Sequence, residues 1–120
     1  MEKNVEFGDL LGKTLVSIQQ SVDELIFKTT EGETYKSYHY HHCCESVGIE
    51  DIEGDLNDLL NAPLTQAEEI TNSEDKMGKV MSESFTWTFY KLATIKGYVT
   101  IRWLGESNGY YSESVDFVKV

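Results

Sequence analysis

The chain has little positive charge, and one long segment has none. Between Lys36 and Lys76 there is no lysine or arginine but there are ten acidic residues, and Arg102 is the only arginine. With 21 acidic against 10 basic residues, the formal net charge is −11. Such a chain has too few cations to release the counterions of nucleic-acid phosphates or anionic membranes, so we expect it to bind neither directly. A partner protein with a basic surface is expected instead.

Cysteines, prolines and long apolar runs are also scarce. The two cysteines are neighbours, Cys43 and Cys44, and a bond between neighbours would close a strained ring, so the sequence predicts reduced thiols. No apolar run approaches the roughly 20 residues that cross a bilayer, and no signal-peptide pattern is seen, so we expect a cytoplasmic protein. Pro63 is the only proline. With no repeat or low-complexity run, residues 1–120 are predicted to form one domain.

Alternation of apolar and polar residues predicts a mainly β protein. Three strands over 14–20, 25–30 and 34–41 are predicted to form a meander, and a hairpin is predicted over 84–95 and 98–104. Extended structure is expected near Val47 and Ile49 and again over 111–117. Asp55 is a good N-cap for one short helix that Pro63 ends, and the polar run 71–79 is predicted to be a loop. The expected fold is α+β, mainly β: a curved antiparallel sheet or partly open barrel of about six strands with one short helix.

The aromatic residues are predicted to divide between core and surface. Rings at alternate positions of a strand share a face, so a core is predicted from Phe85, Trp87, Phe89, Trp103 and Phe117. Tyrosine carries a polar tip suited to interfaces. An interface role is therefore open for Tyr38, Tyr40, Tyr90, Tyr98, Tyr110 and Tyr111.

All histidines and cysteines lie in the short run 39–44, which raises the possibility of a metal site. On a strand, His39, His41 and Cys43 would share one face, and zinc accepts these ligands. The spacing is unlike that of structural zinc sites, which combine two separated pairs of ligands. The competing interpretation is buried cysteines and hydrogen-bonded histidines at the end of a strand. Arg102 is expected to pair with a carboxylate or to hold an anionic ligand.

The same run does not predict an enzyme. A reactive thiolate needs a nearby cation or a helix N-terminus, whereas the carboxylates around Cys43 and Cys44 would raise a thiol pKa. The sequence also lacks a P-loop, a dinucleotide-binding pattern and a nucleophile elbow. We therefore expect a protein without catalytic activity.

The acidic segment is the main candidate for binding a partner. An EF-hand would need a different order of carboxylates, and a solvated face or a helix cap at Asp55 would also account for some of the charge. The predicted partner-binding residues are Glu45, Glu50, Asp51, Glu53, Asp55 and Asp58, together with Tyr38 and Tyr40.

Four runs, 38–45, 49–56, 94–103 and 105–112, carry a resemblance to known sequences. Tyr38-His-Tyr-His-His-Cys-Cys-Glu45 and Gly105-Glu-Ser-Asn-Gly-Tyr-Tyr-Ser112 are its most specific parts. Together the four runs resemble an uncharacterised family of small acidic proteins from tailed bacteriophages and prophages. The resemblance implies a phage setting inside a host cell, where small acidic proteins counter host immunity, and it implies no activity and no functional residues.

The preferred hypothesis is a phage-type acidic protein that binds and inhibits a host protein with a basic surface, an anti-defence role. The alternative is a protein that binds a metal, with zinc as the candidate, or a small ligand such as a nucleotide signal, through the histidine and cysteine cluster. The sequence leaves homo-oligomer formation open.

Overall fold

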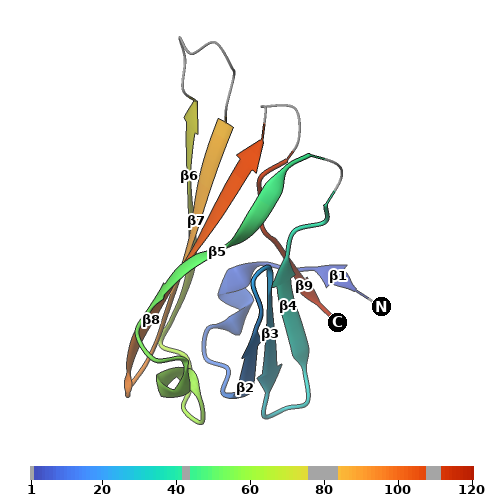
Figure 1. Ribbon diagram of the computed structural model, residues 1–120. Helices are drawn as coiled ribbons and strands as arrows, with labels where there is room; N and C mark the ends of the chain where they lie inside the picture. Colours follow the sequence, from blue (N-terminus) through green and yellow to red (C-terminus); the bar gives the residue numbers. More distant parts are fainter. Residues whose placement is uncertain (1, 42–43, 76–83, 108–111) are drawn as a thin grey trace.

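Two antiparallel β-sheets pack face to face (Figure 1). The computed structural model describes residues 2–41, 44–75, 84–107 and 112–120. The prediction of a mainly β protein is confirmed. The sheets do not close into a barrel, because β1 and β2 are the edges of one sheet and β5 and β6 are the edges of the other.

The first sheet has five strands in the order β1-β9-β4-β3-β2. As predicted, β2, β3 and β4 form a meander, and β9 near the end of the chain lies between β4 and β1. The bounds are β1 Lys3–Asn4, β2 Leu15–Gln20, β3 Glu24–Thr29, β4 Thr34–Tyr38 and β9 Asp116–Lys119.

The second sheet has four longer strands in the order β5-β8-β7-β6. Their bounds are β5 Ser46–Glu53, β6 Gln66–Asp75, β7 Ser84–Thr94 and β8 Gly97–Ser107. The predicted loop over 71–79 is wrong for residues 71–75, which belong to β6, and the rest of that range lies outside the described residues. Pairing of β6 with β7 along its whole length outweighs the polar composition of this segment.

The described part of the chain contains no α-helix, only two 3₁₀ helices, η1 Phe7–Leu10 and η2 Leu56–Leu59. The predicted helix after Asp55 is therefore a single 3₁₀ turn. Its N-cap was correctly identified, because the Asp55 side chain accepts a hydrogen bond from the Asn57 N–H at 2.9 Å. No helix in the described part of the chain is long and apolar enough to span a membrane.

The core lies between the sheets and is rich in aromatic rings from both of them. Phe7 of η1 stacks on Tyr90 of β7 with ring centroids 3.9 Å apart. Phe117 of β9 meets Phe7 edge-on at 5.0 Å and stacks on Tyr35 at 5.5 Å. Trp103 of β8 is fully buried and contacts the edge of Tyr90. Trp103 and Phe117 were correctly assigned to the core.

The other three predicted core residues lie on the outside. Phe85, Trp87 and Phe89 are only half-buried, whereas Thr88 and Tyr90 of the same strand are buried. The inward face of β7 is therefore the opposite of the one predicted.

The register of β7 against β8 is the reason for this reversal. It pairs Tyr90 with Ile101, which is fully buried, and Phe89 with Arg102, which is partly exposed. Side chains directly opposite one another on paired strands share a face, so Phe89 lies on the outer face with Arg102. The buried face of β8 thus decides which face of β7 points inward.

Beyond the aromatic core, a buried carboxylate holds the inner face of the four-stranded sheet. Glu113 is 7% exposed and accepts hydrogen bonds from Ser84 Oγ at 3.2 Å and Thr86 Oγ1 at 2.7 Å, and from Ser107 Oγ. A Cβ on Gly105 would lie 2.5 Å from the Glu113 carbonyl oxygen. Glycine at 105 therefore allows the segment before β9 to approach β8 closely.

At the other end of the molecule, an ion-pair cluster joins the β3–β4 turn to its neighbours. Glu33 pairs with Lys13 at 2.8 Å and with Lys119 of β9 at 2.9 Å, and it accepts a hydrogen bond from the Tyr35 hydroxyl at 3.3 Å. Hydrogen bonds from the two lysines lower the pKa of Glu33 from 4.5 to about 2. The charged form of Glu33 is thus favoured in the folded protein.

This cluster predicts a pH dependence of stability. Because the folded-state pKa of Glu33 is depressed, its contribution is fully present above about pH 4.5 and is lost as the pH falls towards 2. We expect Glu33→Gln to lower the melting temperature at pH 7, and the difference from wild type to shrink below pH 4.5. Thermal unfolding, monitored by circular dichroism at several pH values between about 2 and 7, measures this difference in melting temperature. Glu31→Gln, in the same turn and exposed, is the control and should change little; a pH-independent difference would contradict the prediction.

Candidate partner-binding surface

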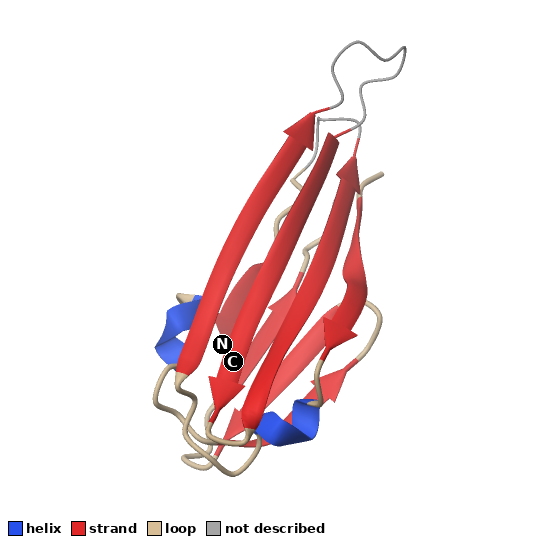
Figure 2. Ribbon diagram, turned by 90° about the vertical axis from the view of Figure 1, so that its left-hand side faces the viewer, coloured by secondary structure: helices blue, strands red, loops and turns tan. Residues whose placement is uncertain are grey.

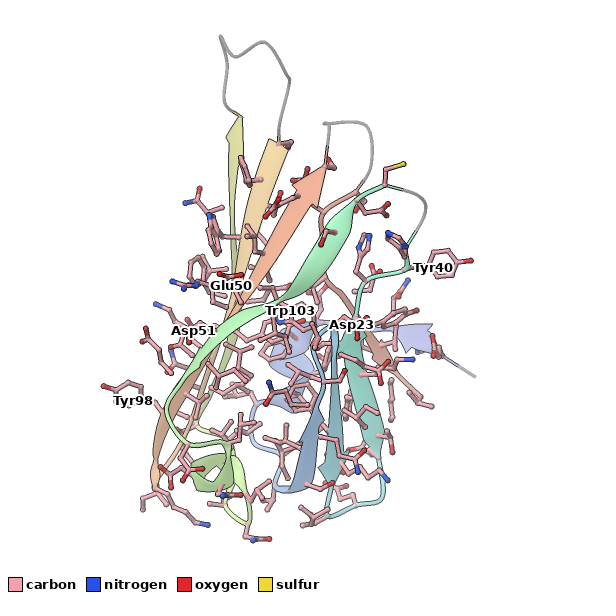
Figure 3. The ribbon with its side chains drawn as sticks, viewed as in Figure 1. Asp23, Tyr40, Glu50, Asp51, Tyr98 and Trp103 are labelled. Atoms are coloured by element: carbon pink, nitrogen blue, oxygen red, sulfur yellow. The ribbon has the colours of Figure 1, made fainter. Side chains whose placement is uncertain are left out.

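Four exposed carboxylates line the β5 edge of the four-stranded sheet and the turn after it. They are Glu50, Asp51, Glu53 and Asp55, and we call them the acidic edge. Glu50 and Asp51 are labelled in Figure 3. Asp58 follows on η2 but is half-buried, with a carboxylate oxygen 3.0 Å from where a Cβ on Gly97 would stand. The structure therefore brings five of the eight predicted partner-binding residues into one stretch of chain at one edge.

A β-bulge turns these carboxylates outward. Ile49 pairs with Trp103 and Asp51 pairs with Arg102, so Glu50 is an extra residue in β5. Without the extra residue, Ile49 and Asp51 would point to the same side. With it, Ile49 and Ile52 both pack against the core, although they are three positions apart. In the local sequence Ile-Glu-Asp-Ile, both isoleucines are thus partly buried against the core and both acids are exposed.

Little positive charge offsets the acidic edge. Arg102 Nη2 is 4.0 Å from Asp51 Oδ2, with the two side chains 40% and 48% exposed, so this pair contributes little energy. Among the described residues, no lysine or arginine lies within ion-pair distance of Glu50, Glu53 or Asp55. The negative field of this edge therefore projects into solvent.

Two open hollows border the acidic edge. One, of about 420 Å³, lies on the outer face of the sheet, where Asp51 and Glu53 meet Phe89 and Lys91. The other, of about 540 Å³, lies along the edge itself between Gln20 and the 49–56 segment. The first hollow combines two carboxylates with two cations, Lys91 and Arg102, and with apolar side chains. The second is lined by Glu50, Asp51 and Asp55 with apolar side chains and no described cation, which suits a partner that carries cationic and apolar groups.

Glu45 does not belong to this surface. Its side chain is fully buried, and its Oε2 lies 2.8 Å from His39 Nε2. The other ring nitrogen of His39, Nδ1, lies 2.7 Å from the Ser114 carbonyl oxygen. A carbonyl can only accept, so Nδ1 donates to it, and the Nε2 contact needs a proton on either His39 or Glu45. Glu45 and His39 therefore tie the ends of β4, β5 and the segment before β9 together.

The two predicted tyrosines lie away from the acidic edge. Tyr38 belongs to the five-stranded sheet, where its hydroxyl donates to Glu2 at 3.1 Å and Lys36 lies over its ring at 4.5 Å. Burial raises the pKa of Tyr38. Tyr40 is 64% exposed and lies on the opposite side of the molecule from Asp51 in Figure 3. A single surface that combines these tyrosines with the acidic edge is not formed.

The three predicted metal ligands are only partly described. His39 and His41 both approach Glu45, with His41 Nε2 2.7 Å from its carbonyl oxygen and 3.8 Å from its carboxylate. Cys43 lies outside the described residues. Within the described ranges, no group of three histidine, cysteine, aspartate or glutamate side chains is placed to hold a metal ion. A zinc site at these residues stays a prediction.

The state of the cysteines differs from the expected reduced thiols. Cys44 is disulfide-bonded, and no described cysteine is free. The only other cysteine of the chain, Cys43, lies outside the described residues.

The sequence analysis missed the outer face of the four-stranded sheet as a surface. It is lined by Phe85, Trp87 and Phe89 of β7, next to Ile70 of β6, which is 42% exposed. The signal was present in the sequence, because large apolar residues occupy both alternating sets of positions in β7. One set contains Phe85, Trp87 and Phe89, and the other contains Tyr90 and Leu92. A strand with this pattern has two apolar faces, and only one of them was considered.

Comparison with known proteins identifies one family. Residues 8–117 match the family model described as a domain of unknown function, DUF7448. No curated protein and no solved structure matches the chain.

The buried pair of Glu45 and His39 predicts an effect on stability. We expect Glu45→Gln to lower the free energy of unfolding by about 1–3 kcal/mol, because an amide forms a weaker hydrogen bond to the buried ring nitrogen of His39 than the acid–imidazole pair does. Urea unfolding measures the change. Glu50→Gln makes the same chemical change on the exposed acidic edge and should stay within about 0.5 kcal/mol of wild type. Equal effects of the two changes would show that the pair contributes nothing.

Zinc content tests the predicted metal site independently. If His39, His41 and Cys43 hold zinc, protein purified without a histidine tag and kept under reducing conditions should contain stoichiometric metal, and His41→Ala should remove it. Elemental analysis of both proteins decides this, and a wild-type protein free of metal rules the site out.

Proposed function

Because the chain belongs to the DUF7448 family, whose function is unknown, we propose a function from its own surface. It is a binding protein without catalytic activity that attaches to a basic surface of another protein through the acidic edge. One observation carries the proposal: Glu50, Asp51, Glu53 and Asp55 are all exposed on one edge, and among the described residues only the pair of Asp51 with Arg102 joins any of them to a cation.

The physical basis is long-range attraction. A net charge of −11 and a group of exposed carboxylates on one edge accelerate encounter with a positively charged partner. The same charge repels nucleic acids and anionic membranes, so the basic partner is a protein. Exposed carboxylates add little to the lifetime of a complex, because water and salt screen them. The acidic edge therefore governs how fast the complex forms, and other contacts govern how long it lasts.

The biological setting we propose is a bacteriophage infection. The resemblance of four runs of this chain to small acidic proteins of tailed phages supports it, as does the high negative charge. In that setting the partner is a host protein with a basic groove, such as a nucleic-acid-binding defence protein, and the acidic edge competes with its usual anionic ligand. The protein would act inside the host cell.

Salt dependence and charge removal test this function. A partner recovered by affinity capture from a bacterial host should bind on the order of tenfold more slowly when salt rises from about 50 to about 500 mM. The triple variant Glu50→Gln, Asp51→Asn, Glu53→Gln should slow association similarly at low salt. Surface plasmon resonance measures both rates.

A control triple separates the edge from net charge alone. Asp9→Asn, Asp23→Asn, Glu31→Gln removes the same charge from exposed positions elsewhere, and it should leave most of the association rate intact. Equal loss in the two triples, or binding that is indifferent to salt, would contradict the role of the acidic edge.

A further inference from the structure

The four-stranded sheet is apolar on both faces, but the described chain covers only one of them. Its inner face, which includes Tyr90 and Trp103, packs against the five-stranded sheet. Its outer face carries Phe85, Trp87 and Phe89 along β7. In Figure 2 this outer face is turned towards the viewer, and no described element crosses it. A sheet with two apolar faces is normally the middle of three layers, and the described residues form only two layers.

The strand register arranges the outer face as an aromatic spine between two acidic flanks. Across the sheet, Phe89 pairs with Arg102 on one side and with Ile70 on the other, and Arg102 pairs with Asp51. We call the two β7 rings Trp87 and Phe89 the aromatic spine. Leu104 of β8 pairs with Trp87 and extends the spine sideways.

The flanks of the spine have an excess of negative charge. The next row of outward-facing residues after Phe89 and Arg102 runs across all four strands. In it, Glu53 pairs with Thr100, Thr100 with Lys91, and Lys91 with Glu68. The outer face thus has carboxylates on both edge strands, β5 and β6. Its cations are Arg102, which lies 5.2 Å from the Trp87 ring, and Lys91. They are outnumbered by the carboxylates of Asp51, Glu53, Glu68 and Glu106.

We propose that this face docks an amphipathic α-helix of a partner protein, with apolar side chains on the aromatic spine and lysine or arginine on both sides of them. This inference rests on the proposed function and specifies the partner's chemistry. Charge complementarity selects a basic helix over a second copy of this chain, because two copies would bring their acidic flanks together, each on a molecule with a net charge of −11.

The dimensions of a helix fit the face. Four strands spaced by about 4.8 Å span about 14 Å from β5 to β6, and a helix with its side chains is about 10–12 Å wide. Rings at alternate positions of β7 repeat about every 6.7 Å, and helix residues four apart repeat about every 6 Å. A helix laid along β7 therefore places successive apolar side chains between successive rings, with its flanking cations over Glu53 and Glu68.

Defined peptides test the proposal with the intact protein. The first probe is a peptide of about 18 residues, free of tryptophan, with leucine along one helical face and lysine on both borders of that face. The second has the same composition in an order without an apolar face. We expect the amphipathic peptide to bind at least about tenfold more tightly than the scrambled one by titration calorimetry. Its binding should also shift the emission of Trp87 to the blue, since the other tryptophan, Trp103, is already fully buried.

Variants assign the binding to the aromatic spine. Trp87→Thr should abolish the difference in affinity between the two peptides. Val22→Thr should preserve that difference, because Val22 is 79% exposed and lies in the β2–β3 turn. Glu53→Gln with Glu68→Gln keeps the rings and removes one carboxylate from each flank. This variant should bind the amphipathic peptide on the order of tenfold more weakly than wild type does. It should fold like wild type, since both positions are exposed.

The outcomes separate this inference from the proposed function. Equal, salt-sensitive binding of both peptides would overturn the helix site and leave the acidic edge as the binding surface. Binding of neither peptide, or binding indifferent to salt, would overturn both. A dimer in sedimentation that Trp87→Thr dissociates would show that a second copy covers the face, and it would also overturn the helix site.

Discussion

The two sheets depend on the stacking of Phe7 against Tyr90, with ring centroids 3.9 Å apart. Phe7 comes from the short η1 segment, which lies beside β6, and its ring also meets Phe27 and Phe117 of the five-stranded sheet. Tyr90 comes from the middle of β7 in the four-stranded sheet. Phe117 meets Phe7 edge-on and Trp103 meets Tyr90 edge-on, so one stacked pair connects both layers. Aromatic contacts of this kind add to the free energy of area burial and restrict the angle between the sheets.

Polar groups replace rings where the sheets extend beyond the aromatic cluster. Glu113 is held by three hydroxyl groups on the inner face of the four-stranded sheet, and Glu45 is held by His39. Each of these carboxylates is buried and hydrogen-bonded, which is the condition under which a buried acid is tolerated. Two of the acidic residues of the chain are thus part of its interior, and the negative surface is smaller than the composition indicates.

The sequence predicted most strands correctly, because alternation and turn residues are local signals. It could not give the inward face of β7, since Phe85 and Tyr90 are both large and apolar, and only pairing with β8 distinguishes them. Glu45 was predicted to be a surface acid for the same reason: its partner His39 is close in sequence, but its burial depends on contacts with distant segments. The common edge of Glu50 to Asp55 could be inferred from the sequence because these residues lie in one continuous stretch, and their role in binding stays a proposal.

The bulge at Glu50 has a consequence for how this surface can change over time. Because the extra residue takes up the mismatch between Ile49 and Ile52, the isoleucines that fill the core and the acids between them are under separate constraints. Mutations can alter the number or spacing of charges at this edge without repacking the interior. The charges of this surface can therefore vary from one homologue to another on the same scaffold.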